Sequence, residues 1–264
     1  MDSVMLTKLM RLLTFTLCAH LSLSAAAATI LVDEGHGQRF SVTREGELQL
    51  SGLAALIEGA GHRLQTHHRQ LNEADLATAD GLIISGAFSA YSDQEIRAIR
   101  QFAHGGGRVA ILIHVGPLNG PLLAGLGVLV SNSVLFDMDN SVGQNGLDFS
   151  VRSLSDHPLF EGIDSFNLYG AWALNASAVT ATNIAFTGEQ AWIDLEGRRA
   201  PEHNPVGVWP VAVSVSMGLG EIVVFGDDAI FQNRFLKENN RRLADNLVNW
   251  LVGGRLPRGQ TASL

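Results

Sequence analysis

Apolar and polar positions along the first half of the chain form short blocks that predict strands and helices in turn. Four apolar runs have the length and composition of strands buried in a parallel sheet. These runs are residues 29–33, 62–66, 81–85 and 108–113. Between them, apolar residues recur at the three- and four-residue spacing of a helix that buries one face. Such alternation predicts an α/β fold with a doubly wound, mostly parallel sheet.

Two predicted helices carry recognisable start and stop signals. The first covers residues 48–60 and is followed by Gly61, a residue that commonly ends helices. The second begins at Ser92-Asp93-Gln94-Glu95, a capping box whose first and last side chains bind free backbone N–H groups, and ends at Gly105-Gly106-Gly107. Because crossovers between parallel strands are right-handed, we expect the carboxyl ends of the strands to lie along one edge.

The second half of the chain has a different pattern. Helical periodicity fades between residues 130 and 210, where short β-like runs predict a strand-rich extension beside the main sheet. Residues 211–225 contain two apolar runs around a glycine-containing turn and predict a hairpin. A last helix is expected over residues 239–251.

The first 28 residues have the three parts of a secretory signal. Lys8 and Arg11 precede an apolar run at residues 12–23, and the alanines at 25–28 supply the small side chains that a signal peptidase requires. The apolar run is short for a bilayer span, and an uncleaved anchor is the alternative.

Composition supports one folded domain after this signal. Apolar residues make up 46% of the chain and charged residues 17%, which is typical of a globular protein rather than a disordered one. We expect a single domain over residues 29–252, a flexible tail at 253–264, no transmembrane span after cleavage, and a periplasmic or secreted location. The only cysteine, Cys18, lies in the signal, so no cysteine nucleophile remains. A net charge of −8 argues against a nucleic-acid partner.

The residues that follow the predicted strands form the candidate site, because ligands of doubly wound sheets bind beyond the carboxyl ends of the strands. Asp33-Glu34-Gly35-His36 is the densest group; its carboxylates and imidazole could bind a cation or act as acid and base. The alternative is that Asp33 caps a turn and His36 is a solvated loop residue. The spacing matches no standard metal signature, and no cofactor is expected. The candidate ligand-binding residues are Asp33, Glu34, His36, Gln38, Arg39, Ser85, Gly86, His114, Asp227, Asp228 and Asn233.

Several of these segments together resemble the DUF4350 family. The resemblance rests on Asp33-Glu34-Gly35-His36-Gly37, Tyr91-Ser92-Asp93-Gln94-Glu95, Gly105-Gly106-Gly107 and Gly226-Asp227 with Asn233, Asn246 and Trp250-Leu251. That family is similar to class I glutamine amidotransferase-like domains, which are flavodoxin-like, so the resemblance implies this scaffold. Amidotransferases carry a cysteine at a sharp turn that corresponds here to residues 113–117, where no cysteine, serine or threonine stands. The resemblance therefore does not imply amidotransfer.

Two functions follow as hypotheses. The first is an exported, non-catalytic domain that binds a small molecule or an envelope protein at the carboxyl edge of the sheet. The second is a hydrolase without a covalent nucleophile, in which Asp33 or Glu34 activates water, His36 or His114 moves protons, and Asp227 orients the histidine. Convergence of these groups on one open pocket would favour the hydrolase. The missing nucleophile favours the binding domain.

Overall fold

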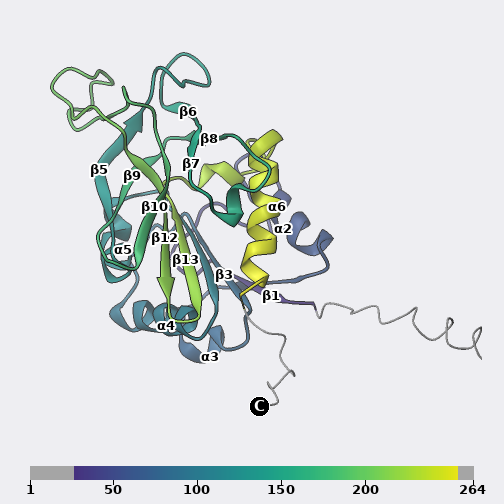
Figure 1. Ribbon diagram of the computed structural model, residues 1–264. Helices are drawn as coiled ribbons and strands as arrows, with labels where there is room; N and C mark the ends of the chain where they lie inside the picture. The colour runs from purple at the N-terminus through teal and green to yellow at the C-terminus, as the bar shows by residue number, and fades with distance from the viewer. Residues whose placement is uncertain (1–26, 255–264) are drawn as a thin grey trace, which may run out of the picture.

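The computed structural model describes residues 27–254, so the predicted signal up to residue 26 and the predicted tail from residue 255 lie outside the described residues. The main sheet has eight strands in the order β2-β1-β3-β4-β13-β12-β10-β7 (Figure 1). The neighbouring strands at one end of this sheet are all parallel. They are β2 (Arg63–His67), β1 (Thr29–Asp33), β3 (Gly81–Ser85), β4 (Arg108–Leu112) and β13 (Gly220–Phe225).

The other end of the main sheet is antiparallel, so the sheet that was expected to be mostly parallel is mixed. β12 (Pro210–Met217) pairs with β13, β10 (Ala181–Phe186) pairs with β12, and β7 (Ser153–Leu154) pairs with β10. The reversal begins in the β12–β13 hairpin, where Gly218 has a φ of 61°, a left-handed conformation that glycine adopts without strain. The predicted hairpin therefore adds antiparallel strands to the parallel ones.

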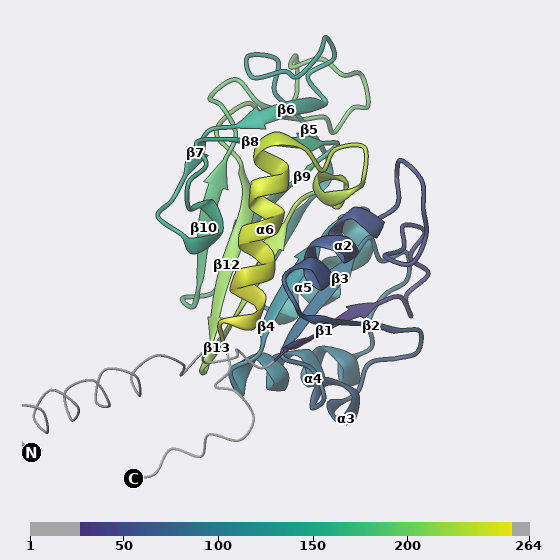
Figure 2. The ribbon, with the colours of Figure 1, turned by 90° about the vertical axis from the view of Figure 1, so that its right-hand side faces the viewer.

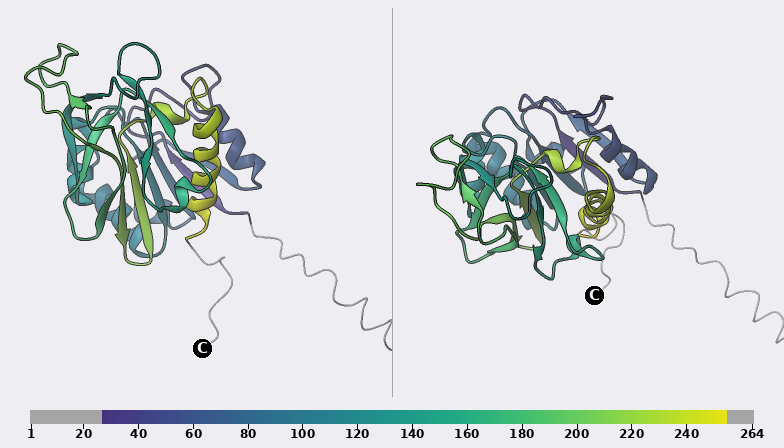
Figure 3. Two further views of the ribbon diagram at one scale, coloured as in Figure 1. Left: turned by 45° about the horizontal axis from the view of Figure 1, so that its top comes forward. Right: turned by 90° about the horizontal axis from the view of Figure 1, so that it is seen from above.

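Residues 130–210, for which the sequence predicts a strand-rich extension, hold two small sheets beside the antiparallel end of the main sheet (Figure 3). One has the order β11-β5-β9, and the other pairs β6 with β8. The strands are β5 (Val128–Phe136), β6 (Asp148–Val151), β8 (Phe166–Tyr169), β9 (Trp172–Ala176) and β11 (Trp192–Ile193). β9 packs against β12, which joins the extension to the main sheet.

Helices cover both faces of the main sheet. α2 (Ser51–Gly59) and α6 (Glu238–Val252) lie together on the face that is turned to the viewer in Figure 2. The other face packs against α3 (Glu73–Leu76), α4 (Asp93–His104) and α5 (Gly120–Gly125). Single 3-10 turns occur at Pro117–Asn119, Pro158–Phe160 and Ala229–Phe231. None of the described helices combines the length and the apolar character that a bilayer-spanning segment needs.

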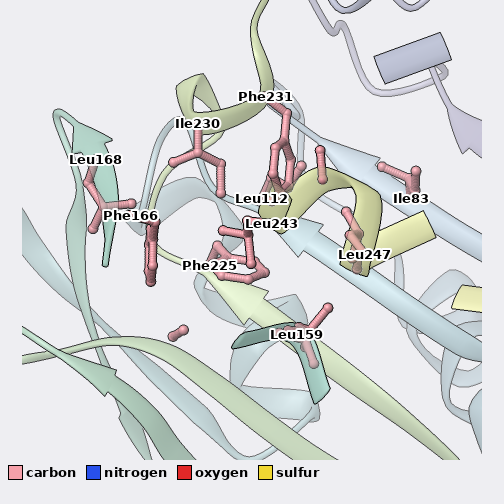
Figure 4. Packing of buried hydrophobic residues seen from close by; sticks show 14 of the residues in the cluster. Ile83, Leu112, Leu159, Phe166, Leu168, Phe225, Ile230, Phe231, Leu243 and Leu247 are labelled. Atoms are coloured by element: carbon pink, nitrogen blue, oxygen red, sulfur yellow. The ribbon is translucent and has the colours of Figure 1, made fainter. Parts of the chain in front are cut away.

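The core beneath α6 joins the main sheet to the extension. Leu112 of β4 and Phe225 of β13 are partners in the strand register, and both are fully buried beside Leu243 of α6 (Figure 4). Phe166 of β8 belongs to the same cluster, with its ring centroid 6.1 Å from that of Phe225. Because one apolar core includes side chains from both parts, the extension and the main sheet stabilise each other.

A partly buried carboxylate at the amino edge of β13 connects three elements. Glu221 accepts hydrogen bonds from His157 Nε2 at 3.1 Å, from Trp250 Nε1 at 3.0 Å and from Ser214 Oγ. Arg108 donates to the carbonyl of Trp250 and lies over its ring. Burial disfavours the ionised carboxylate, but the hydrogen bonds from His157, Ser214 and Trp250 outweigh it and lower the pKa of Glu221 to about 2.

We predict that Glu221→Gln removes an acid-dependent part of the stability. Because the folded-state pKa lies below the ordinary value of 4.5, this contribution is complete above pH 4.5 and is lost as the pH falls towards 2. The variant should lose about 3 kcal/mol of unfolding free energy at pH 7 and show a flatter curve at acid pH. Urea unfolding followed by circular dichroism between pH 2 and 7 measures both effects. The matched control is Glu202→Gln at an exposed loop position; equal acid sensitivity in the Glu221 variant and the wild type would refute the assignment.

Candidate functional site

The predicted site residues lie at one edge of the main sheet because β1, β3, β4 and β13 run in the same direction. The register pairs Ser85 of β3 with Leu112 of β4, and Leu112 with Phe225 of β13, so the three strands end at the same level. β1 ends beside β3, with Asp33 opposite Ile84. The chain order changes direction between β1 and β3, because β2 lies on one side of β1 and β3 on the other. In open α/β sheets such a switch point is where ligands bind.

Asp33 and His36 meet in a closed, buried network. Asp33 Oδ2 accepts hydrogen bonds from His36 Nδ1 at 2.8 Å, from Gln38 Nε2 at 2.9 Å and from the hydroxyl of Tyr91. The other ring nitrogen, His36 Nε2, lies 2.9 Å from Glu95 Oε1, and the Tyr91 ring stacks on the imidazole with centroids 3.7 Å apart. Asp33, His36 and Glu95 are each at least 97% buried. These groups hold each other and leave no face of the imidazole open.

The charges of this network support its structural role. Burial opposes the charged imidazolium, but the hydrogen bonds and charges of Asp33 and Glu95 outweigh it and raise the pKa of His36. The carbonyl of His36 accepts hydrogen bonds from the N–H groups of Phe88 and Ser89, at 2.8 and 2.9 Å. The network therefore fixes the loop after β1, the loop after β3 and the start of α4 together.

Glu34 and Asn233 hold neighbouring loops. Glu34 Oε1 accepts hydrogen bonds from the Ser41 hydroxyl at 2.8 Å and from the N–H of Val42 at 3.0 Å. Asn233 Oδ1 accepts from the N–H of Gly52 at 2.7 Å, in the first turn of α2. Both side chains satisfy backbone or hydroxyl groups of the segment between β1 and α2, which orders that segment over the edge of the sheet.

Asp227 and Asp228 are adjacent in sequence but face different partners. Asp227 is buried and accepts hydrogen bonds from the N–H groups of Tyr169 at 2.7 Å and Ala229 at 2.8 Å. Burial, and then the charge of Asp228, raise the pKa of Asp227 well above its usual range. Asp228 instead places Oδ1 2.9 Å from Nδ1 of His114. Of the two carboxyl groups, Asp228 is therefore the one that reaches a candidate imidazole.

His114 is the histidine of the predicted set that remains accessible. Its side chain is 36% exposed, whereas Asp228 behind it is 2% exposed. No hydrogen bond to His114 Nε2 occurs within residues 27–254. The hydrogen bond that His114 donates to Asp228, together with the charge of Asp228, raises the pKa of His114 against the opposing effects of burial and of the Arg39 charge. The pair therefore holds one ring nitrogen fixed and presents the other outward.

Aromatic side chains surround this imidazole. The Phe88 ring lies 4.8 Å and the Phe40 ring 5.2 Å from the centroid of His114, and the Arg39 guanidinium lies 4.8 Å over Phe88. Trp172 Nε1 donates a 3.0 Å hydrogen bond to the carbonyl of His114, which fixes the backbone of the residue. Arg39, Phe40, Phe88 and His114 are all at least partly exposed and form one continuous rim.

Two buried polar atoms at this edge of the sheet have no hydrogen-bond partner within the described part of the chain. They are Ser85 Oγ, at the end of β3, and Asp228 Oδ2, in the pair itself. A Cβ atom on Gly86 would lie 2.5 Å from Asp228 Oδ2, and Gly86 has a φ of 61°, so this close approach requires glycine. Buried polar groups are normally satisfied, and a bound water or ligand would satisfy these.

The structure thus divides the predicted residues into three sets. Around the His114 imidazole it gathers Arg39, Gly86 and Asp228, and Ser85 ends the neighbouring strand β3. The closed network contains Asp33, His36 and Gln38, while Glu34, Asp227 and Asn233 hold loops. Sequence reasoning did not place Phe40, Phe88, Tyr91 or Glu95 in the site; the one available signal was the capping box, which is present at Ser92 and Glu95. Within residues 27–254, no group of three or more histidine, cysteine and acidic side chains is arranged to hold a metal ion.

Together, the fold and the site define a mixed α/β domain with a histidine–aspartate pair, His114 and Asp228, at the carboxyl edge of its parallel strands. The chain belongs to the family described as Domain of unknown function (DUF4350), which matches residues 44–248. This confirms the family resemblance seen in the sequence.

Several solved structures share the fold. The mmIFT52 N-terminal domain is 16% identical with a TM-score of 0.68, and the match covers 87% of this chain and 99% of that one. A cytoplasmic protein from Salmonella typhimurium LT2, STM1381, is 12% identical with a TM-score of 0.55, covering 84% and 99%. A ThuA-like protein from Bacteroides uniformis is 12% identical with a TM-score of 0.53, covering 88% and 95%. No curated protein matches the sequence. At these identities the likeness shows the fold alone.

We predict that two substitutions beside His114 change the pKa of its imidazole in opposite directions. Asp228→Asn removes the largest upward influence on the pKa of His114, so this pKa should fall. Arg39→Gln removes a neighbouring positive charge, so the same pKa should rise. NMR titration of the His114 ring measures both changes. Arg44→Gln, at an exposed position on the same loop, should shift the pKa less than Arg39→Gln; shifts of the same sign in the Asp228 and Arg39 variants would disprove the geometry.

Proposed function

We propose that this protein is an exported, non-catalytic domain that binds a small ligand at the carboxyl edge of its sheet, around His114 and Asp228. The observation that carries the proposal is the His114 imidazole itself. One of its nitrogens is anchored 2.9 Å from Asp228, and the other is presented at a partly exposed rim. Asp228 Oδ2, buried behind the imidazole, has no hydrogen-bond partner among the described residues.

The arrangement of the other acid–base candidates supports binding rather than catalysis. General acid–base chemistry needs a carboxylate and an imidazole that reach one bound atom. Asp33 and His36 are hydrogen-bonded to each other inside the closed network, and Asp227 is hydrogen-bonded to backbone groups. The predicted carboxylates and imidazoles therefore do not converge on one open pocket.

We also propose that the scaffold is flavodoxin-like, of the class I glutamine amidotransferase-like kind. The order of the parallel strands, β2-β1-β3-β4-β13, corresponds to the 2-1-3-4-5 order of flavodoxin-like sheets, with helices on both faces. The departure from that pattern is the antiparallel end built from β12, β10 and β7. In sheets of this order the ligand lies at the switch point, here between β1 and β3, beside Ser85 and Gly86.

Export follows from the predicted signal over residues 1–28 and gives a direct prediction. Expressed in a Gram-negative bacterium, the protein should be recovered from the periplasm or the medium with an N-terminus near Thr29. Intact-mass measurement of each fraction tests this. Arg11→Glu, which reverses one charge of the positive start, should lower the exported fraction. Protein that stays in the cytoplasm at full length would exclude export.

Ligand binding is tested with a thermal-shift panel of metabolites. A ligand of the site should raise the melting temperature of the wild type by several degrees, because it binds the folded state alone. His114→Gln should lose most of the shift. His68→Gln, at a histidine 63% exposed on a neighbouring loop, should keep it. A panel without any stabilising compound, or equal shifts in the wild type and the His114 variant, would refute the proposal.

A hydrolase is the second candidate, and one observation favours it. A carboxylate that holds one nitrogen of an imidazole, while the other faces a bound water, is the arrangement of a general base. His114 and Asp228 have the first half of this arrangement. Turnover of small esters or amides that disappears in both His114→Gln and Asp228→Asn, but persists in His68→Gln, would establish the hydrolase in place of the binding domain.

A further inference from the structure

The geometry points to a ligand class for this site. We propose that His114 and Arg39 together bind the carboxylate of a small organic acid whose apolar part lies against Phe40 and Phe88. This inference rests on the proposed binding function and deepens it by naming the chemistry of the ligand.

Two basic side chains face the same rim without a counter-ion between them. Arg39 is exposed, and no carboxylate lies within ion-pair distance of it in the described residues. Its guanidinium is held over Phe88, whose other neighbour is the His114 imidazole. The Arg39 charge opposes protonation of His114 but does not outweigh the influence of Asp228, which raises the pKa of the imidazole. The Phe88 ring, rather than an acidic side chain, therefore positions Arg39 near the second basic side chain, His114.

At this rim Arg39 offers hydrogen-bond donors, and Nε2 of His114 becomes a donor when the imidazole is protonated. Asp228 is 2% exposed and lies behind the imidazole, where it fixes Nδ1. A protonated His114 then presents its Nε2–H, and Arg39 presents guanidinium N–H groups. A carboxylate supplies two acceptor oxygens and a negative charge, which matches one donor from each residue. A cation would be repelled by Arg39, and a neutral amide would gain less from the two charges.

The surroundings favour an organic carboxylate over inorganic phosphate. Phosphate sites commonly use several backbone N–H groups at the start of a helix. Here the donors are two side chains, and the adjoining surface consists of the Phe40 and Phe88 rings, 5.2 and 4.8 Å from the imidazole. Partly exposed aromatic rings beside a few polar groups are typical of sites for ligands with an apolar body.

Isothermal titration of the protein with matched probes tests the inference. The probes are benzoate, its neutral isostere benzamide, acetate and inorganic phosphate. We expect benzoate to bind about tenfold more tightly than benzamide or phosphate, and more tightly than acetate. Arg39→Gln and His114→Gln should each weaken benzoate binding about tenfold. Arg44→Gln removes the same charge from an exposed position on the same loop and should change the affinity by less than about twofold.

Each contrary result has a defined meaning. Equal affinity for benzoate and benzamide, or equal losses in the Arg39 and Arg44 variants, would overturn carboxylate recognition. Tighter binding of phosphate than of benzoate would overturn the organic-acid class, as would failure of both carboxylates to bind. In all of these cases the proposed function survives if another compound of the metabolite panel stabilises the protein through His114. It fails only if the whole panel gives no His114-dependent stabilisation.

Discussion

Parallel pairing of β1, β3, β4 and β13 is the constraint on which the site depends. Each strand is followed by one or two residues of the site. The neighbouring strands β4 and β13 are far apart in sequence, since the register partners Arg108 and Glu221 are separated by 113 positions. Because the strands run in the same direction, the residues after Asp33, Ser85, Leu112 and Phe225 meet at one edge. An antiparallel arrangement would send half of these groups to the other end of the molecule.

Two histidines at this edge, each bound by carboxylates, show how burial decides the role of a side chain. His36 lies between Asp33 and Glu95, with both nitrogens engaged and its ring covered by Tyr91. His114 has one acidic partner and a side chain that is 36% exposed. His36 therefore stabilises the surrounding loops, whereas His114 retains a ring nitrogen without a partner among the described residues. Phe88 connects them, since its N–H binds the His36 carbonyl and its ring contacts His114.

The sequence predicts those parts of the structure that local patterns determine. Strand periodicity, the capping box at Ser92 and the hairpin around Gly218 can all be read from a few consecutive residues. The hairpin, however, joins the parallel sheet through β13 and extends it with the antiparallel strands β12, β10 and β7. No local pattern specifies which distant strands pair or in which register. Likewise, nothing local distinguishes Asp227 from Asp228. One faces backbone N–H groups and the other an imidazole 114 positions away, and this difference arises only when β4 and β13 pair.

The closed network around His36 and the His114–Asp228 pair act together, because both hold the same edge of the sheet in position. A binding site gains affinity when its donors are already held in position, because less conformational freedom is then lost on binding. Here the network holds the loops after β1 and β3, Asp228 holds the imidazole, and Trp172 holds the backbone of His114. Gly86 makes this possible, since any side chain at that position would displace the carboxylate. Asp33 and Asp227, whose carboxylates suggest acid–base chemistry when read from the sequence, thus hold neighbouring side chains and backbone in position.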